Sequence, residues 1–304
     1  MASPATTHIY RTIDVPVSGG HLRAGIWDPV TNADEPPTVL AIHGITATHQ
    51  SWLHLPQMLP GFRIVAPDLR GRGRSNTLPG PYGMGRHADD LADLLHALGT
   101  KKVTAVGHSM GGFVAVVLSH RHPGLTTRLV LADGGLPLDS PDGVDPDAIM
   151  QAVLGPAIQR LAMTFPGHSA YREFWAKHPA FGPALVEELG AYFDYDLEPA
   201  GTGWRPSSRI EAVTEDQREL VTGHSLRPAL EQLTLPTTFI HAPRGLLDDA
   251  PLYGPEHAEA CAAQAPSITM KWARGVNHYT IVMSRPGAQF VAEQVAPARE
   301  GVQG

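Results

Sequence analysis

The chain has 304 residues, of which 42% are hydrophobic and 17% charged, a composition typical of a globular protein rather than a disordered or fibrous one. A net charge of −7, with no basic cluster beyond the arginines of segment 70–74, argues against a nucleic-acid-binding protein. The single cysteine, Cys261, excludes an internal disulfide and a cysteine-rich metal site.

Targeting signals are not visible in the sequence. The N-terminal residues have neither the basic n-region nor the apolar h-region of a secretory signal peptide. No stretch approaches the roughly 18 consecutive apolar residues that a membrane-spanning helix needs. We therefore expect a soluble protein of the cytoplasm that makes no contact with a membrane.

The first half of the chain contains several strand-like segments. Segments 8–17 and 21–28, joined around two glycines, predict an antiparallel hairpin. Four continuous aliphatic runs follow, as expected of strands that are buried on both faces: 38–44, 63–68, 103–108 and 128–133.

Helical patterns separate these runs. One has Leu91, Leu94, Leu95 and Leu98 at helical spacing and ends at Gly99. Another covers residues 110–122 and is stopped by a Pro-Gly pair. Strands that alternate with helices predict an α/β fold, a mostly parallel, doubly wound sheet with helices on both faces.

The alternation breaks between residues 137 and 225. No clear strand is visible there, and proline and glycine separate the helical candidates 145–165, 168–178, 182–197 and 210–222. The alternation resumes with a strand at 237–242, a helix near 255–265, a strand at 268–272 and a helix near 286–296. The simplest account is an α/β domain, residues 1–136 and 226–304, with a helical cap, residues 137–225, inserted after its sixth strand.

One motif stands in a context that fits catalysis. Residues 107–111, Gly-His-Ser-Met-Gly, match the nucleophile-elbow pattern G-x-S-x-G. The pattern needs a strand before it and a helix after it, and both are predicted here. Ser109 would then occupy a sharp turn, and the positive end of the following helix would point at the reacting atoms.

Four segments together resemble the α/β-hydrolase fold family, of the type that carries a helical cap. They follow one another in the family's order and span about residues 38–290: 43–46 (His-Gly-Ile-Thr), 68–75 (Asp-Leu-Arg-Gly-Arg-Gly-Arg-Ser), the elbow, and 275–279 (Gly-Val-Asn-His-Tyr). The resemblance implies a serine nucleophile, a histidine base and an acid in that fold. It does not imply a substrate.

The resemblance assigns further roles residue by residue. His278, in the loop after the last strand, is the expected general base. The oxyanion hole is expected to use the backbone N–H groups of Met110 and Ile45. We interpret His43 as a brace for the loop that holds Ile45, and His108 as a packing residue.

The acid of the triad has two candidates. Many family members carry it after the seventh strand, where Asp248 stands late in a long loop. Others carry it at the tip of the sixth strand, where Asp133 stands. We favour Asp133 because a strand tip holds a carboxylate more rigidly than a long loop does. Asp248 remains the alternative.

The cap carries nine aromatic residues, which could form its own core or line an apolar pocket above Ser109. If these residues line a pocket, we expect a small apolar or aromatic substrate, an acyl compound or a lactone. The nine are Phe165, Tyr171, Phe174, Trp175, Phe181, Tyr192, Phe193, Tyr195 and Trp204.

These observations predict a serine hydrolase, an esterase or lactonase that works through Ser109, His278 and an aspartate. Three alternatives stay open: a C–C bond hydrolase of a diketone-like substrate, a cofactor-free perhydrolase or haloperoxidase, and a slow-turnover small-molecule receptor. Serine at the nucleophile position argues against an epoxide hydrolase or a dehalogenase. No cofactor and no metal site are predicted. A homodimer is possible, and the sequence does not determine the oligomeric state.

Overall fold

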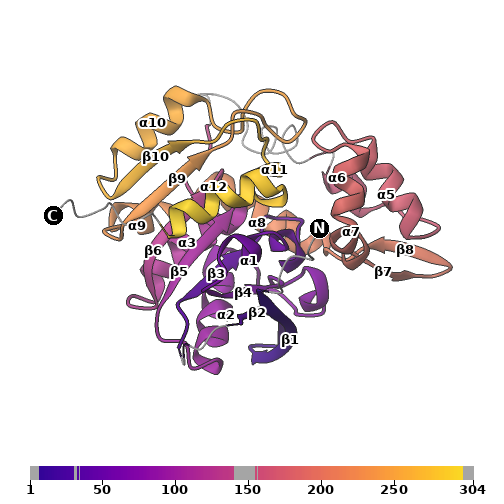
Figure 1. Cartoon of the computed structure of the whole chain (residues 1–304), viewed down its shortest axis with the longest axis horizontal. Helices are drawn as coiled ribbons and strands as arrows, with labels where there is room; N and C mark the ends of the chain where they lie inside the picture. Colours follow the sequence, from indigo (N-terminus) through magenta and orange to yellow (C-terminus); the bar gives the residue numbers. More distant parts are fainter. Residues whose placement is uncertain (1–6, 31–32, 34, 140–154, 156, 297–304) are drawn as a thin grey trace.

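The computed structural model describes residues 7–30, 33, 35–139, 155 and 157–296. Its centre is an eight-stranded sheet in the order β1-β2-β4-β3-β5-β6-β9-β10 (Figure 1). Strand β2 runs antiparallel to β1 and β4, and all strands from β4 to β10 are mutually parallel. The strands are β1 (His8–Val17), β2 (Gly20–Pro29), β3 (Thr38–Ile42), β4 (Arg63–Pro67), β5 (Val103–His108), β6 (Thr126–Ala132), β9 (Thr237–His241) and β10 (Ile268–Trp272).

Hydrophobic layers cover both faces of this sheet. On β3, Leu40 and Ile42 point into one layer, whereas Val39 and Ala41 point into the other, as the alternation along a strand requires. The predicted doubly wound sheet is therefore confirmed. The first layer holds side chains of α2 (Met84–Ala97), α3 (Met110–Arg121), α8 (Ile210–Thr222), α9 (Leu226–Glu231) and α10 (Pro255–Ala263), and the second holds those of α1 (Leu55–Met58), α11 (Thr280–Met283) and α12 (Arg285–Val295).

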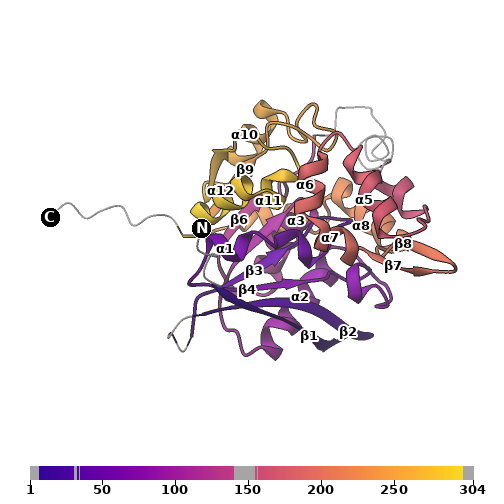
Figure 2. The same cartoon turned by 45° about the vertical axis from the view of Figure 1, so that its right-hand side comes forward.

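The segment between β6 and β9 adds a lobe beside the sheet (Figures 1 and 2). The expectation that it contains no strand was wrong, because two short antiparallel strands pair there. Their sequences contain two prolines and no apolar alternation, so no strand signal is visible. The lobe contains α5 (His168–Ala176), α6 (Pro183–Glu188), α7 (Gly190–Tyr195), β7 (Leu197–Ala200) and β8 (Gly203–Pro206).

Other elements of the insertion match the predictions from the sequence to different degrees. The helix expected over 182–197 is two helices, α6 and α7, which meet at Leu189. The candidate helix 145–165 lies largely outside the described residues, although 157–161 are helical. Helix α8 was expected at residues 210–222 and is found there. The domain boundaries at 136 and 225 remain predictions.

Candidate active site

Ser109 stands in a strained turn between β5 and α3. Its backbone angles are φ 52° and ψ −125°, a region that residues other than glycine rarely occupy. The turn fits only because the residues around it are small: a Cβ on Gly111 would lie 2.0 Å from the carbonyl oxygen of Ile42. The G-x-S-x-G spacing therefore has a steric cause, and the turn lifts the serine above the sheet at the N-terminus of α3.

The structure brings His278 and Asp133 together. The distance from His278 Nδ1 to Asp133 Oδ2 is 2.7 Å, and both residues are almost completely buried. Asp133 follows β6 directly, has φ 49°, and accepts a second hydrogen bond from the N–H of Ala242 at 3.1 Å. Because Nδ1 donates to the carboxylate, the Nε2 atom of the neutral imidazole is left as the proton acceptor.

Asp248 lies elsewhere and contacts different groups. One of its oxygens accepts from Asn277 Nδ2 at 2.8 Å, and the other pairs with Arg244 Nη1 at 2.7 Å. Asn277 also donates to the carbonyl oxygen of Ala180, in the cap. Asp248 therefore braces the residue that precedes His278 and does not reach the imidazole.

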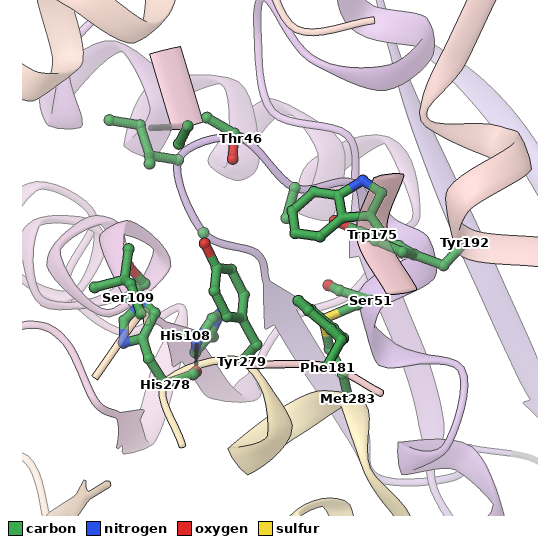
Figure 3. A pocket seen from close by; sticks show the side chains of 15 residues that line it. Thr46, Ser51, His108, Ser109, Trp175, Phe181, Tyr192, His278, Tyr279 and Met283 are labelled. Atoms are coloured by element: carbon green, nitrogen blue, oxygen red, sulfur yellow. Dashed lines mark hydrogen bonds between the residues drawn. The ribbon is translucent and has the colours of Figure 1, made fainter. Parts of the chain in front are cut away.

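Ser109 and His278 line the same pocket (Figure 3). Within the described part of the chain, Ser109 Oγ forms no hydrogen bond with another residue. The bond between nucleophile and base is often long without substrate and shortens in the reacting complex. The pocket thus presents an unbonded serine hydroxyl next to a histidine whose other nitrogen is held by a carboxylate.

The loop that holds Ile45 comes close to Ser109 because Gly44 lacks a side chain. A Cβ on Gly44 would lie 3.2 Å from the Cβ of Ser109. His43 braces the loop: its Nε2 accepts from the N–H of Leu69 at 3.0 Å, so its Nδ1 donates to Gly44 O at 2.7 Å. Burial lowers the pKa of His43 to about 3, so this neutral form persists at physiological pH.

Arg72 also holds the loop that carries Ile45, and nothing in the sequence indicated this contact. Arg72 donates through Nε to the carbonyl oxygen of Ile45 at 2.8 Å, and its Nη1 lies 2.5 Å from Asp216 Oδ2 in α8. Asp216 also accepts from His87 Nε2 at 2.9 Å. All three side chains are fully buried. A lone aspartate in an amphipathic helix gives no sign that it supports a loop that is distant in sequence.

We expect Asp216→Asn to destabilise the protein by about 3 kcal/mol at neutral pH, because it leaves the charge of Arg72 buried without its partner. Burial alone would raise the pKa of Asp216, but His87 and Arg72 lower it from 3.8 to about 2. The carboxylate therefore stabilises the fold above about pH 4, and this contribution is lost as the pH falls toward 2.

Denaturant unfolding of both proteins between pH 3 and 7 tests this prediction. The difference in unfolding free energy between wild type and Asp216→Asn should become smaller as the pH falls. Glu211→Gln, an exposed change in the same helix, is the control and should stay within about 0.5 kcal/mol of wild type. If this difference in unfolding free energy were the same at every pH, Asp216 would not stabilise the fold through its charge.

His108 holds the backbone of His278 through a hydrogen bond. Its Nε2 donates to the carbonyl oxygen of His278 at 2.7 Å, and the two ring centroids are 4.8 Å apart. Burial, and then the neighbouring His278, hold the pKa of His108 well below its ordinary value. His108 therefore stays neutral and anchors the backbone that carries the candidate base.

The pocket above Ser109 contains about 520 Å³ of empty space, part of which is open to solvent. Of the nine aromatics considered in the sequence, Trp175, Phe181 and Tyr192 line it. These three, together with Phe165, Tyr171 and Phe193, belong to the buried layer shared with the main sheet. Sequence reasoning did not assign Tyr279, Met283, Leu246, Thr46 or Ser51 to the pocket, and all five line it. Tyr279 directly follows His278, and this adjacency was the one available signal.

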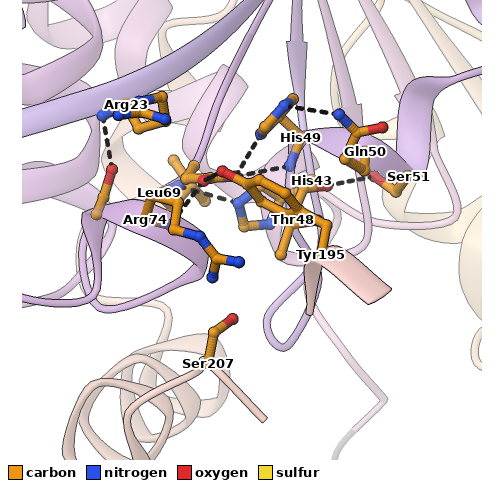
Figure 4. Close-up of polar contacts among 12 residues, drawn as sticks. Arg23, His43, Thr48, His49, Gln50, Ser51, Leu69, Arg74, Tyr195 and Ser207 are labelled. Atoms are coloured by element: carbon orange, nitrogen blue, oxygen red, sulfur yellow. Dashed lines mark hydrogen bonds and ion pairs between the residues drawn. The ribbon is translucent and has the colours of Figure 1, made fainter. Parts of the chain in front are cut away.

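The lobe between β6 and β9 contacts the loop after β4 through Tyr195 (Figure 4). Tyr195 of α7 donates to Asp68 Oδ2 at 2.6 Å, and Arg74 lies over the Tyr195 ring at 4.5 Å. Asp68 also pairs with His49 at 2.8 Å. Burial alone would raise the pKa of Asp68, but His49 and the hydrogen bonds hold it well below its ordinary value. These contacts therefore join α7 to the loop that follows β4.

No group of three or more His, Cys, Asp or Glu side chains is arranged to hold a metal ion in the described part of the chain. None of the helices described there is long and apolar enough to cross a bilayer.

Comparison with known proteins identifies the family of the fold. Residues 37–271 match the family model of the alpha/beta hydrolase fold, so the chain belongs to that hydrolase family. It is 39% identical over 124 residues to the lipase LipV of Mycobacterium tuberculosis, covering 36% of this chain and 47% of that protein. It is 36% identical over 122 residues to a putative 2-succinyl-6-hydroxy-2,4-cyclohexadiene-1-carboxylate synthase of Bacillus subtilis, covering 40% and 43% of the two chains.

A solved structure, that of E-2-(acetamidomethylene)succinate hydrolase, superposes with a TM-score of 0.75 over 95% of this chain and 100% of the other. The two sequences are 20% identical, so this likeness concerns the fold. The chain spans less than half the length of the curated relatives that it matches.

Proposed function

We propose that the protein is a serine hydrolase that cleaves a carboxylic ester or lactone through Ser109, His278 and Asp133. The observation that carries the proposal is the 2.7 Å contact between His278 Nδ1 and Asp133 Oδ2, at the wall of the pocket that also exposes Ser109. A histidine held in this way keeps Nε2 free to take the serine proton.

The proposed reaction has two halves. His278 Nε2 takes the proton of Ser109 Oγ as that oxygen attacks the ester carbonyl, and the oxyanion accepts from the N–H groups of Met110 and Ile45. The intermediate collapses, the alcohol leaves with the proton from His278, and an acyl-serine remains. Water then attacks this acyl group and gives a proton to His278. The second tetrahedral intermediate collapses as His278 returns that proton to Ser109 Oγ, so the carboxylic acid and free Ser109 result.

The pocket supports a small apolar or aromatic substrate. Trp175, Phe181 and Met283 give it apolar walls, while Tyr192 and Tyr279 add one hydroxyl each. Stacked and edge-on aromatic side chains contact flat acyl groups well.

The experiment compares an aryl ester such as 4-nitrophenyl butyrate with a ring-cleavage diketone, alongside a fluorophosphonate probe that labels reactive serines. Ester turnover with labelling of Ser109 supports the proposal. Turnover of the diketone alone would replace it with C–C bond hydrolysis, and peroxide-dependent oxidation would replace it with perhydrolase activity. Tight ligand binding with negligible turnover would favour a receptor.

A further inference from the structure

A second cavity adjoins the pocket above Ser109. It contains about 420 Å³ of empty space, part of it open to solvent, and shares Ala157, Trp175, Leu246 and Tyr279 with that pocket. The far wall of this side cavity consists of Arg160, Phe174, His178 and Leu247. A substrate whose reacting carbonyl lies at Ser109 could therefore extend past Trp175 and Tyr279 into the side cavity.

Arg160 is the charged residue of this wall, and only 3% of it is exposed. Its Nη1 donates to Asp196 Oδ2 at 2.8 Å and to the Tyr171 hydroxyl. Its Nε is buried and has no hydrogen-bond partner, and its Nη2 has none among the described residues. Its guanidinium carbon lies 5.1 Å from the Trp175 ring centroid and 5.9 Å from the Tyr171 ring centroid, so two aromatic rings pack against the cation.

Other arginines of the protein show what the Nε and Nη2 edge ordinarily binds. Arg23, Arg70, Arg121 and Arg172 each direct Nε and Nη2 together at the two oxygens of one carboxylate. This paired arrangement matches the geometry of a carboxylate better than any single contact does. In Arg160 the same edge is free, and the ion pair uses Nη1 instead.

Two other polar side chains of the side cavity can also donate hydrogen bonds to a ligand. The N–H of Ala180 donates to His178 Nδ1 at 3.2 Å, so the proton of a neutral His178 is on Nε2. Burial and then the charge of Arg160 lower the pKa of His178. The hydroxyl of Tyr279 forms no hydrogen bond within the described part of the chain. Asp196, the carboxylate nearest to Arg160, is bound on the Nη1 side, away from the open edge.

We propose that the side cavity binds a carboxylate carried by the substrate, on the free Nε and Nη2 edge of Arg160, and so selects esters or lactones with a second, ionised carboxyl group. The inference rests on the proposed function, because it names the class of substrate that the same serine would cleave. It makes Arg160 a specificity-determining residue in a cap that the sequence marked only by its aromatics.

The test uses paired substrates that differ in one group. Monoethyl glutarate and monoethyl adipate carry the carboxylate on the acyl side, 4-acetoxybutanoate carries it on the alcohol side, and each is paired with its neutral carboxamide. We expect kcat/KM to favour the acid of at least one pair by about tenfold or more, mainly through KM. Acid and amide within twofold of each other in every pair would overturn the inference while the hydrolase proposal stands.

The matched variants replace a charge pair by a neutral one. Arg160→Met with Asp196→Asn removes the open edge without leaving a buried carboxylate unpaired, and should abolish the preference for the acid. Arg172→Met with Asp194→Asn makes the same change at a partly exposed pair outside the side cavity and should keep the preference. A preference that survives the first double variant would overturn the inference.

A binding measurement separates this inference from the proposed function. Calorimetry on Ser109→Ala protein should show adipate binding more tightly than adipamide, and NMR should show the pKa of His178 rising when adipate binds, because the bound charge offsets Arg160. If no ester is cleaved and adipate still binds at Arg160, the function proposal fails and the subsite stands. If adipate and adipamide bind equally, the subsite fails.

Discussion

Ser109→Ala should abolish hydrolysis, with a loss on the order of 10⁴-fold or more in kcat, and should leave the fold intact. The side chain stands in a turn whose shape is set by the backbone and by the glycines around it, so removing one oxygen does not disturb the turn. It does remove the atom that would form the acyl-enzyme. Rates with an aryl ester, probe labelling and circular dichroism measure the three parts of this expectation.

His278→Ala provides the partner for a double-mutant cycle. Residues that act as one unit lose nearly the same activity singly or together, so the double variant should be little worse than either single variant. If the two losses multiplied, His278 would not serve Ser109 as its base. Retained turnover in Ser109→Ala would remove the nucleophile from the mechanism altogether.

Much of the main sheet was predictable because its signals are local. Buried parallel strands such as β5 read as short aliphatic runs, and helices such as α2 read as leucines at helical spacing, regardless of what surrounds them. The elbow was predictable for a similar reason, since Ser109 needs its small neighbours within four positions of the chain. The hairpin of β7 and β8 was missed because both strands are four residues long and contain proline, which gives no strand signal.

The supports of the site were not predictable, because each joins residues that are distant in sequence. Arg72 contacts Ile45 on one side and Asp216 on the other, and Asp216 lies in α8, more than 140 positions further along the chain. The open edge of Arg160 is visible only after Asp196 and Tyr171 are seen to occupy Nη1. Sequence patterns indicate periodicity and local turns, whereas such contacts depend on the tertiary fold, which brings distant residues together.

The choice of acid is the remaining prediction with a large effect. Asp133→Asn keeps the size of the side chain but offers an amide to His278 Nδ1, which favours the wrong tautomer and removes the charge that stabilises the imidazolium. We expect a loss on the order of 10⁴-fold in kcat, with KM little changed. Steady-state kinetics on an aryl ester, with thermal melts of both proteins, provide the measurement.

Asp248→Asn is the matched control, since it changes the other aspartate that sequence reasoning left open. Asp248 contacts Asn277 and Arg244, in a pair that is partly exposed, so its replacement should loosen the loop before His278 and cost far less turnover than Asp133→Asn. The two aspartates therefore differ in kind: one holds the tautomer of the base, whereas the other holds the backbone that positions it. A loss at Asp248 equal to that at Asp133 would show that loop position, not the carboxylate on Nδ1, limits the reaction.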